Sequence, residues 1–236
     1  MGRKLLLIIL FISFTAQSQD LGPKNLFSQA IGKNIKKYKQ QSKIAYANKD
    51  YEHADFLFDS LITHVVNKSY LDNFKVRKLS GRKVELNDFE KPVFLITYAS
   101  WCTPGKGEIP ALNDIAKEYS KHIDFIILFW DSKDKVRKAS RKYNNKVTIL
   151  YVDEKENVND HVIQTMKHSL GFPTSFFINE DKMIVDVRRG ILRPYQEEYE
   201  ISFELNYKAL LNGISLLKNF ADIEKKGVVS KNEPTL

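Results

Sequence analysis

The stretch that decides the fold is Val93–Leu112, VFLITYASWCTPGKGEIPAL. It opens within a continuous apolar run, Pro92–Ser100, whose β-branched residues are typical of a buried central strand. A helix is predicted over Glu108–His122. Cys102 lies between the two and is the only cysteine among 236 residues, so the chain can form no internal disulfide. The stretch therefore predicts a buried strand, a loop with the single thiol, and a helix.

The rest of the chain alternates short apolar runs with amphipathic stretches. A hairpin is predicted to turn at Ser80-Gly81, and a second one at Glu180–Lys182. Further strands are predicted at 123–131, 147–153, 174–179 and 182–190, and further helices at 132–143, 157–170 and 194–220, with a break near Gly213. This order predicts an α/β fold with a mixed central sheet flanked by helices.

The N-terminal part differs from the rest, because residues 26–70 show apolar positions at helical spacing. We expect a helical hairpin that turns at 48–50, with Asp50 capping the second helix. A tetratricopeptide module is the alternative, but no second copy follows at the required period. The predicted division is a signal peptide at 1–18, a helical segment at 19–72, a main domain at 73–222 and a flexible tail at 223–236.

The first residues have the pattern of an export signal. Arg3 and Lys4 precede the apolar run Leu5–Phe14, and Ala16-Gln17-Ser18 supplies small residues for cleavage after Ser18. The apolar run is short for a membrane span, and no later segment is long enough. We therefore expect an exported protein, periplasmic or secreted, with no membrane span after cleavage. A buried N-terminal helix or strand is the alternative.

Composition and charge limit the remaining function classes. The formal net charge is +8, but basic and acidic residues are interleaved along the chain. The basic patch at 33–43 indicates a helix face that is exposed to solvent. No nucleic-acid-binding motif accompanies it, so no nucleic-acid partner is expected. The five histidines lack metal-ligand spacing, and there is no glycine-rich phosphate loop. We expect no metal and no cofactor.

The position of Cys102 between a strand and a helix suggests a reactive thiol. If the helix begins near Cys102, its N–H groups and dipole favour a thiolate. Lys106 would add positive charge, and Pro104 suits a first helical turn. These features predict a thiol pKa below the usual value of about 8.5. A buried structural cysteine is the alternative.

Two motifs resemble the exported TlpA-like thiol-disulfide oxidoreductases of the thioredoxin-like superfamily. The first is Trp101-Cys102-x-Pro104 with Glu108-Ile109-Pro110 behind it, and the second is Gly171-Phe172-Pro173-Thr174. The resemblance covers about residues 74–220 and implies a thioredoxin-like fold. A peroxiredoxin loop is not indicated, because LITYASWC lacks the proline that such a loop carries.

The resemblance also implies roles for four residues. Cys102 would be the attacking thiol, Trp101 the aromatic residue beside it, Pro173 a cis-proline that shapes the substrate groove, and Glu108 an acid that assists proton transfer. Each has a simpler alternative. Trp101 can be hydrophobic cover, Pro173 an ordinary strand start, and Glu108 an acid that complements the helix dipole.

Two positions depart from the family pattern. Gly105 stands where the second active-site cysteine is expected, and Ile96 where many relatives have a buried acid or polar residue. A single thiol cannot expel a mixed-disulfide partner by internal attack. The sequence therefore predicts single-cysteine thiol-disulfide exchange with protein or small-molecule thiols and disulfides. A redox-inactive module that binds peptides or proteins is the alternative, and a homodimer linked through Cys102 is a third hypothesis.

Overall fold

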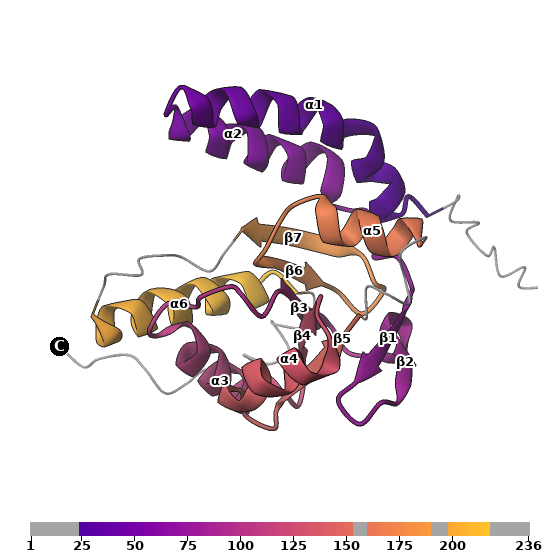
Figure 1. Ribbon diagram of the computed structural model, residues 1–236, viewed down its shortest axis with the longest axis vertical. Helices are drawn as coiled ribbons and strands as arrows, with labels where there is room; N and C mark the ends of the chain where they lie inside the picture. The colour runs from indigo at the N-terminus through magenta and orange to yellow at the C-terminus, as the bar shows by residue number, and fades with distance from the viewer. Residues whose placement is uncertain (1–23, 153–159, 190–197, 218–236) are drawn as a thin grey trace, which may run out of the picture.

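A computed structural model describes residues 24–152, 160–189 and 198–217 (Figure 1). The predicted signal peptide, its cleavage site and the predicted C-terminal tail lie outside these ranges. Among the described helices, none combines the length and the apolar character needed to cross a bilayer.

The core of the molecule is a seven-stranded sheet in the order β2-β1-β5-β4-β3-β6-β7. The strands are β1 (Lys75–Lys78), β2 (Lys83–Glu85), β3 (Val93–Tyr98), β4 (Asp124–Phe129), β5 (Val147–Tyr151), β6 (Thr174–Ile178) and β7 (Ile184–Arg189). β3, β4 and β5 run parallel, whereas all other neighbours pair antiparallel. This mixed sheet, with β3 between β4 and β6, confirms the predicted α/β class and the thioredoxin-like arrangement.

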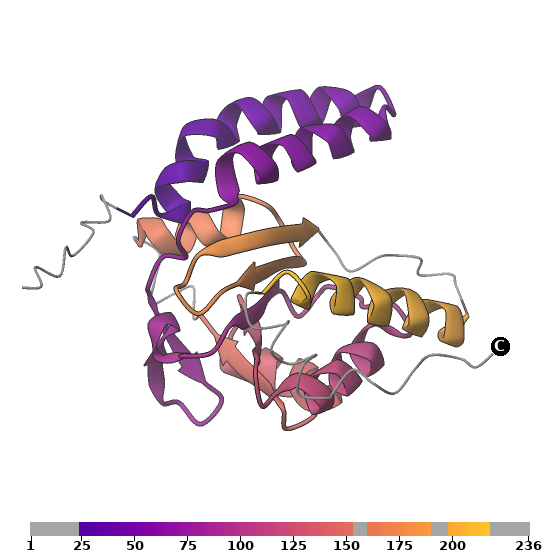
Figure 2. The ribbon, with the colours of Figure 1, turned by 180° about the vertical axis from the view of Figure 1, so that it is seen from behind.

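Helices cover both faces of the sheet (Figures 1 and 2). The α-helices are α1 (Phe27–Ala47), α2 (Tyr51–Leu61), α3 (Glu108–Tyr119), α4 (Lys133–Ala139), α5 (His161–His168) and α6 (Tyr199–Ile214). Shorter turns are η1 (Ile62–Val66), η2 (Leu86–Asp88) and η3 (Ser140–Lys142). One hydrophobic cluster packs α1, α2 and α5 on one face, and a second packs α3, α4 and α6 on the other.

β3 separates these two clusters. All six of its residues are buried, as its apolar run predicts. Because side chains alternate along a strand, Val93 and Leu95 join the cluster under α1 and α2. Phe94, Ile96 and Tyr98 join the cluster under α3 and α6. The loop that follows β3 is thus anchored by a strand that is packed on both faces.

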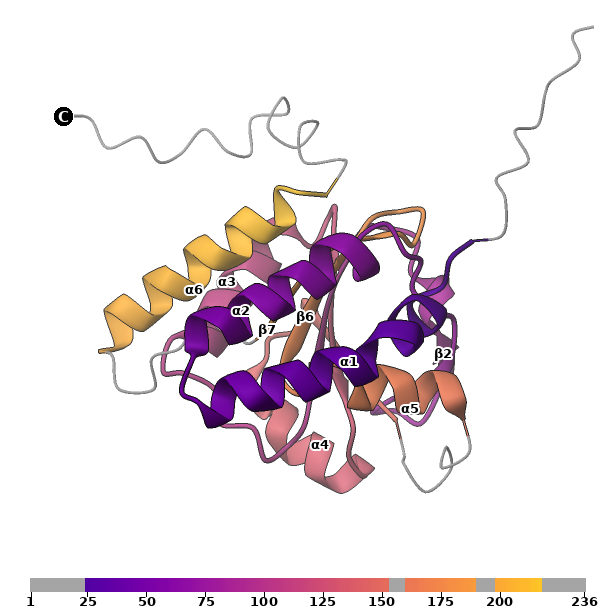
Figure 3. The same cartoon turned by 90° about the horizontal axis from the view of Figure 1, so that it is seen from above.

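The N-terminal hairpin shares its core with the sheet. Seen from above, α1 and α2 lie side by side (Figure 3). Asp50 caps α2 by accepting a 3.1 Å hydrogen bond from the backbone N–H of His53, as predicted. The ring of Phe27 meets that of Phe176 edge-on at 5.6 Å, and the buried Ser28 hydroxyl donates to Asp72 at 2.6 Å. The boundary at residue 72 stays a prediction.

Two helix predictions need correction. The predicted helix at 132–143 is divided into α4 and the short turn η3. The predicted helix at 194–220 is shorter in the structure, where α6 spans Tyr199–Ile214 and ends one residue after the break that was predicted near Gly213. Gly213 is required there for packing, since a methyl group at this position would lie 2.1 Å from the ring of Phe177. The glycine lets α6 approach the sheet closely.

Candidate functional site

The loop with Cys102 is longer than the sequence suggested. β3 ends at Tyr98, and α3 begins at Glu108 with Gly107 as its N-cap, so Cys102 lies six residues before the first helical residue. The prediction that Cys102 lies at or next to the N-terminus of the helix, with Pro104 in its first turn, is wrong. Loop N–H groups find other acceptors, because the N–H of Gly105 donates to the Glu108 carboxylate at 3.1 Å.

Lys106 also lies differently from the prediction. Its Nζ is 3.9 Å from a carboxylate oxygen of Glu198, just before α6, and both side chains are largely exposed. Lys106 therefore forms a long, exposed ion pair with Glu198. The helix start, one of the two features from which the sequence predicted a low thiol pKa, is therefore not at Cys102, and Lys106, the other feature, lies near the carboxylate of Glu198.

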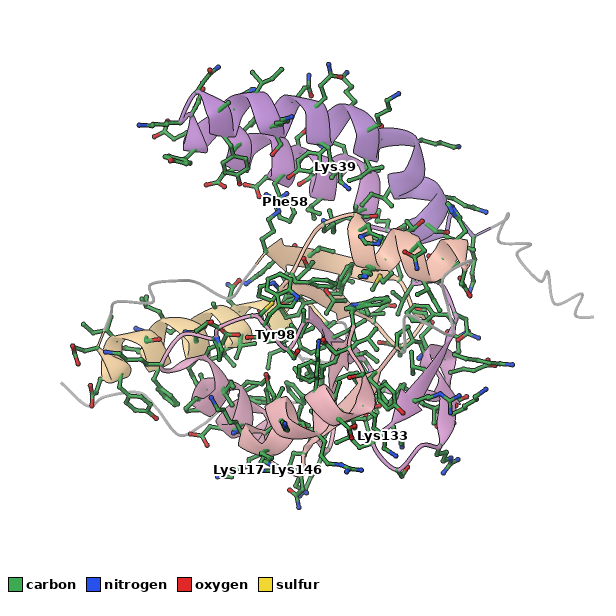
Figure 4. All side chains as sticks on the ribbon, viewed as in Figure 1. Lys39, Phe58, Tyr98, Lys117, Lys133 and Lys146 are labelled. Carbon is green, nitrogen blue, oxygen red and sulfur yellow. The ribbon has the colours of Figure 1, made fainter. Side chains whose placement is uncertain are left out.

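Cys102 is half-buried and faces the interior. It borders a cavity of about 110 Å³, lined by Tyr98, Ser100, Cys102, Pro104, Ile109, Phe129, Ala139, Lys142 and Tyr143. Figure 4 labels Tyr98 at the end of β3, close to the centre of the molecule. The cavity gives the thiol a small surrounding of mixed character, with apolar side chains, hydroxyl groups and Lys142 in its wall.

Tyr143 is the residue of this cavity that sequence reasoning missed. Burial raises the pKa of its phenol, and the negative charges of Glu108 and Cys102 raise it further. Tyr143, Glu108 and Cys102 therefore share one electrostatic neighbourhood. No sequence motif marks Tyr143, because it follows the short turn η3, 41 positions after Cys102.

An asparagine pair holds the segment that carries Tyr143. The Asn113 side chain on α3 donates to the carbonyl of Lys142 at 2.9 Å and accepts from the N–H of Asn144 at 2.8 Å. The Asn144 side chain returns a 2.7 Å hydrogen bond to the carbonyl of Asn113. These three bonds hold the residues just before and just after Tyr143, and so keep Tyr143 at the cavity.

The loop Gly171–Thr174 lies beside the Cys102 loop. The peptide bond Phe172–Pro173 is cis, and β6 follows directly, pairing with β3 so that Thr174 faces Thr97. The rings of Trp101 and Phe172 meet at 6.3 Å. The structure thus brings together the two motifs that are 71 residues apart in the sequence.

The aromatic contact continues inward from the surface. Trp101 is 73% exposed, Phe172 is half-buried, and Trp130 is buried, with the rings of Phe172 and Trp130 6.2 Å apart. Asp131, next to Trp130, accepts hydrogen bonds from the N–H and hydroxyl of Ser100 at 2.6 and 3.0 Å. This carboxylate ties the start of the Cys102 loop to the end of β4.

Glu108 is half-buried, and its carboxylate holds the loop through Gly105. That contact suits a residue that shapes the loop, while its electrostatic effect on Tyr143 places its charge near the cavity. Within the ranges that the structure describes, no group of three or more His, Cys, Asp or Glu side chains is placed to hold a metal ion.

Comparison with known proteins agrees with this geometry. The model of the AhpC/TSA family matches residues 68–187. The thiol-disulfide oxidoreductase ResA of Bacillus thuringiensis subsp. konkukian is 31% identical over 131 residues, which are 54% of this chain and 72% of ResA. The thioredoxin-like protein YneN of Bacillus subtilis is 25% identical over 136 residues, 56% of this chain and 76% of YneN.

Similar solved structures include a putative thiol:disulfide interchange protein DsbE from Chlorobium tepidum, with 22% identity and a TM-score of 0.47, covering 63% of this chain and 97% of that one. A thio-disulfide isomerase from Thermus thermophilus has 22% identity and a TM-score of 0.46, with the same coverage. Since the family model spans half of the sequence and ResA is covered over most of its length, the chain belongs to the AhpC/TSA family, among its TlpA-like thiol-disulfide oxidoreductases of thioredoxin-like fold.

Proposed function

We propose that this protein carries out thiol-disulfide exchange outside the cytoplasm through Cys102 alone. The observation that carries the proposal is the contact between the two motif loops, where Trp101 of the thiol loop meets Phe172, the residue before Pro173, at 6.3 Å. Membership of a thiol-disulfide oxidoreductase family supports the same chemistry.

The proposed reaction has two steps. The Cys102 thiolate attacks one sulfur of a partner disulfide, forms a Cys102–partner disulfide, and releases the other partner sulfur as a thiolate. A second thiol, protein-borne or small, then attacks the mixed disulfide and takes over the partner sulfur, which restores the Cys102 thiolate. Electrons balance without an external oxidant, because one disulfide is exchanged for another.

The surrounding residues take proposed roles in these steps. Trp101, with most of its ring exposed, offers an apolar surface beside the thiol. Pro173 shapes the backbone next to it, and Glu108 acts on the protonation of the site through its charge. We also propose that residues 1–18 direct export, that 19–72 form a helical segment and 73–222 the main domain, and that a Cys102-linked homodimer is one product of exchange.

The proposal is tested by the reaction of folded protein with 5,5′-dithiobis(2-nitrobenzoate), an aromatic disulfide. We expect release of one equivalent of coloured thiolate from the folded protein, and no release from the Cys102→Ser variant. Protein unfolded in guanidinium chloride gives the reference rate of the unprotected thiol. A Cys102 that reacts only after unfolding would count against the proposal.

A redox-inactive binding module is the second candidate function. It is favoured by Gly105 in place of a second cysteine and by the distance of Cys102 from the start of α3. The Cys102→Ser variant separates the two candidates in the native organism. Full retention of the biological phenotype would favour the binding module, whereas loss of the phenotype with normal protein levels favours exchange.

A further inference from the structure

A cleft that is larger than the Cys102 cavity lies elsewhere in the described part of the chain. It has a volume of about 570 Å³, within the range of about 300–1,000 Å³ that is typical of ligand sites. One wall is α2 with η1, and the other is the outer strand β7. Figure 4 shows Phe58 on the side of the hairpin that faces the sheet. The lining residues from α2 and η1 lie outside the residues 68–187 that match the family.

β7 is the last strand of the sheet. Its first residue is already covered, because Ile184 exchanges hydrogen bonds of 2.9 and 2.8 Å with Lys68 and Ser69. Further along, the N–H of Val187 donates to the carboxylate of its own neighbour, Asp186, at 2.9 Å. The backbone donor of Val187 is therefore taken, whereas the other edge groups from Asp186 to Arg189 have no further strand beside them in the described residues. Such an edge is a template for an added strand.

The α2 wall is acidic. Asp55 and Asp59 are one helical turn apart on α2, exposed, and lie on the cleft. Within the described ranges, neither forms an ion pair. Across the cleft, Arg188 is neutralised by Asp186 at 2.7 Å and turned toward the carbonyl of Ala209. The cleft therefore presents two carboxylates that have no cationic partner in the described residues.

Arg189 forms the floor of the cleft. Its guanidinium lies over the ring of Phe58 at 4.2 Å and near that of Tyr38 at 5.4 Å, and it donates to the Tyr46 hydroxyl at 3.3 Å. Its Nε is buried without a hydrogen-bond partner. The two rings hold the guanidinium in place. Arg189 is thus a fixed donor group that can hydrogen-bond to an acceptor such as a peptide carbonyl.

We propose that the cleft between α2 and β7 binds an extended segment of a partner polypeptide that carries a lysine or arginine side chain. The segment would pair with the β7 edge, place its basic side chain between Asp55 and Asp59, and turn a carbonyl toward Arg189. The four β7 residues that line the cleft correspond to about 10 Å of extended chain, which fits a short segment. An acidic segment is disfavoured, because it would meet two carboxylates.

The experiment uses fluorescein-labelled hexapeptides without cysteine and measures anisotropy with the Cys102→Ser protein. Because neither the protein nor the peptides contain a thiol, the result of this binding experiment does not depend on whether Cys102 carries out thiol-disulfide exchange. We expect a peptide of alternating valine and lysine to bind at least tenfold more tightly than one of alternating valine and glutamate. The protein carries a formal net charge of +8, so general electrostatics would give the opposite preference.

Three variants of the experiment locate the binding. The double substitution Asp55→Asn with Asp59→Asn should weaken binding of the basic peptide at least tenfold, whereas Glu52→Gln, also exposed on α2 but outside the cleft, should leave it unchanged. A peptide with proline in place of its central valine should bind more weakly, since it lacks a backbone donor. Equal binding of both peptides, no binding, or full binding by the double variant would overturn the proposal.

Discussion

Two glycines of the Cys102 loop, two positions apart, have different surroundings. A methyl group at Gly107 would lie 2.1 Å from the backbone nitrogen of Phe203 in α6, and the N–H of Gly107 donates to the buried hydroxyl of Ser202 at 3.0 Å. At Gly105, the nearest atom to such a methyl group is the Ser202 Oγ, at 3.4 Å. Packing requires glycine at 107 and not at 105.

The difference bears on the missing second thiol. The family resemblance leads us to expect the second cysteine at position 105, and neither the backbone φ nor the neighbours of Gly105 demand a glycine. The loss of that thiol is therefore not a by-product of the close approach of α6, which Gly107 alone accommodates. The Gly107 end of the loop is fixed against α6, whereas the Cys102 end borders a cavity.

The largest effect is expected for Gly107→Ala. The added methyl group meets backbone atoms of α6, which cannot rotate away, so we expect a loss of about 3 kcal/mol in the free energy of unfolding. Urea unfolding followed by circular dichroism measures it. Gly105→Ala is the matched control and should change stability by less than about 1 kcal/mol in either direction. Equal losses in the two variants would contradict the contrast between the two ends of the loop.

The next effect is the ability to form an internal disulfide, which we expect the variant Gly105→Cys to gain. Because a Cβ fits at this position, the variant should fold normally and present two thiols in the Trp101–Gly105 segment. After mild oxidation we expect an internal disulfide, seen as a mass two daltons lower with no thiol left to alkylate. The reduced variant should also reduce insulin disulfides faster than the parent chain.

Gly105→Ser is the control, since it has a similar side chain and no second thiol. If the oxidised Gly105→Cys protein still alkylates at both positions, the loop has moved away from the two-thiol geometry of its relatives. That outcome would leave only intermolecular exchange at Cys102 and would weaken the idea that one substitution separates this chain from a two-thiol protein.

How much of this could be predicted from the sequence differs between the two ends of the loop. β3 was predictable because its apolar run is local and continuous, and the start of α3 at Glu108 also followed from periodicity. The error was to place Cys102 at or next to the N-terminus of that helix, whereas it lies six residues before the first helical residue. The contact that holds the Gly107 end of the loop is also not local, because its N–H donates to the hydroxyl of Ser202 on α6, 95 residues later in the chain.

The cavity and the cleft could not be predicted for the same physical reason. Tyr143 reaches Cys102 through the Asn113–Asn144 hydrogen bonds, and Arg189 reaches Phe58 by packing of β7 against α2. Such contacts join distant segments and leave no periodic or local signal. The pairing of the Trp101 and Phe172 loops was foreseen only through family resemblance, and the catalytic roles of these residues stay predictions.

The smallest effect concerns the Cys102 end and its buried phenol. Burial first, and then the charges of Glu108 and Cys102, raise the pKa of Tyr143 above its usual value near 10. The folded state therefore holds the proton more tightly than the unfolded chain, so its stabilising contribution is complete below about pH 10 and is lost as the pH rises further. Wild-type protein should lose about 1 kcal/mol between pH 8 and pH 11 through this residue, and Tyr143→Phe should lose less.

The Gly107 end supplies the matched control for this titration. Tyr207 on α6 donates to Glu118 at 2.9 Å, and burial together with that carboxylate raises its pKa to about 12, but it is more exposed than Tyr143. Urea unfolding at several pH values, with tyrosinate absorbance at 295 nm, measures both variants. Tyr207→Phe should recover less of the alkaline loss than Tyr143→Phe. If the order is reversed, the phenol of Tyr143 is more open to solvent than that of Tyr207, which would contradict its burial at the cavity.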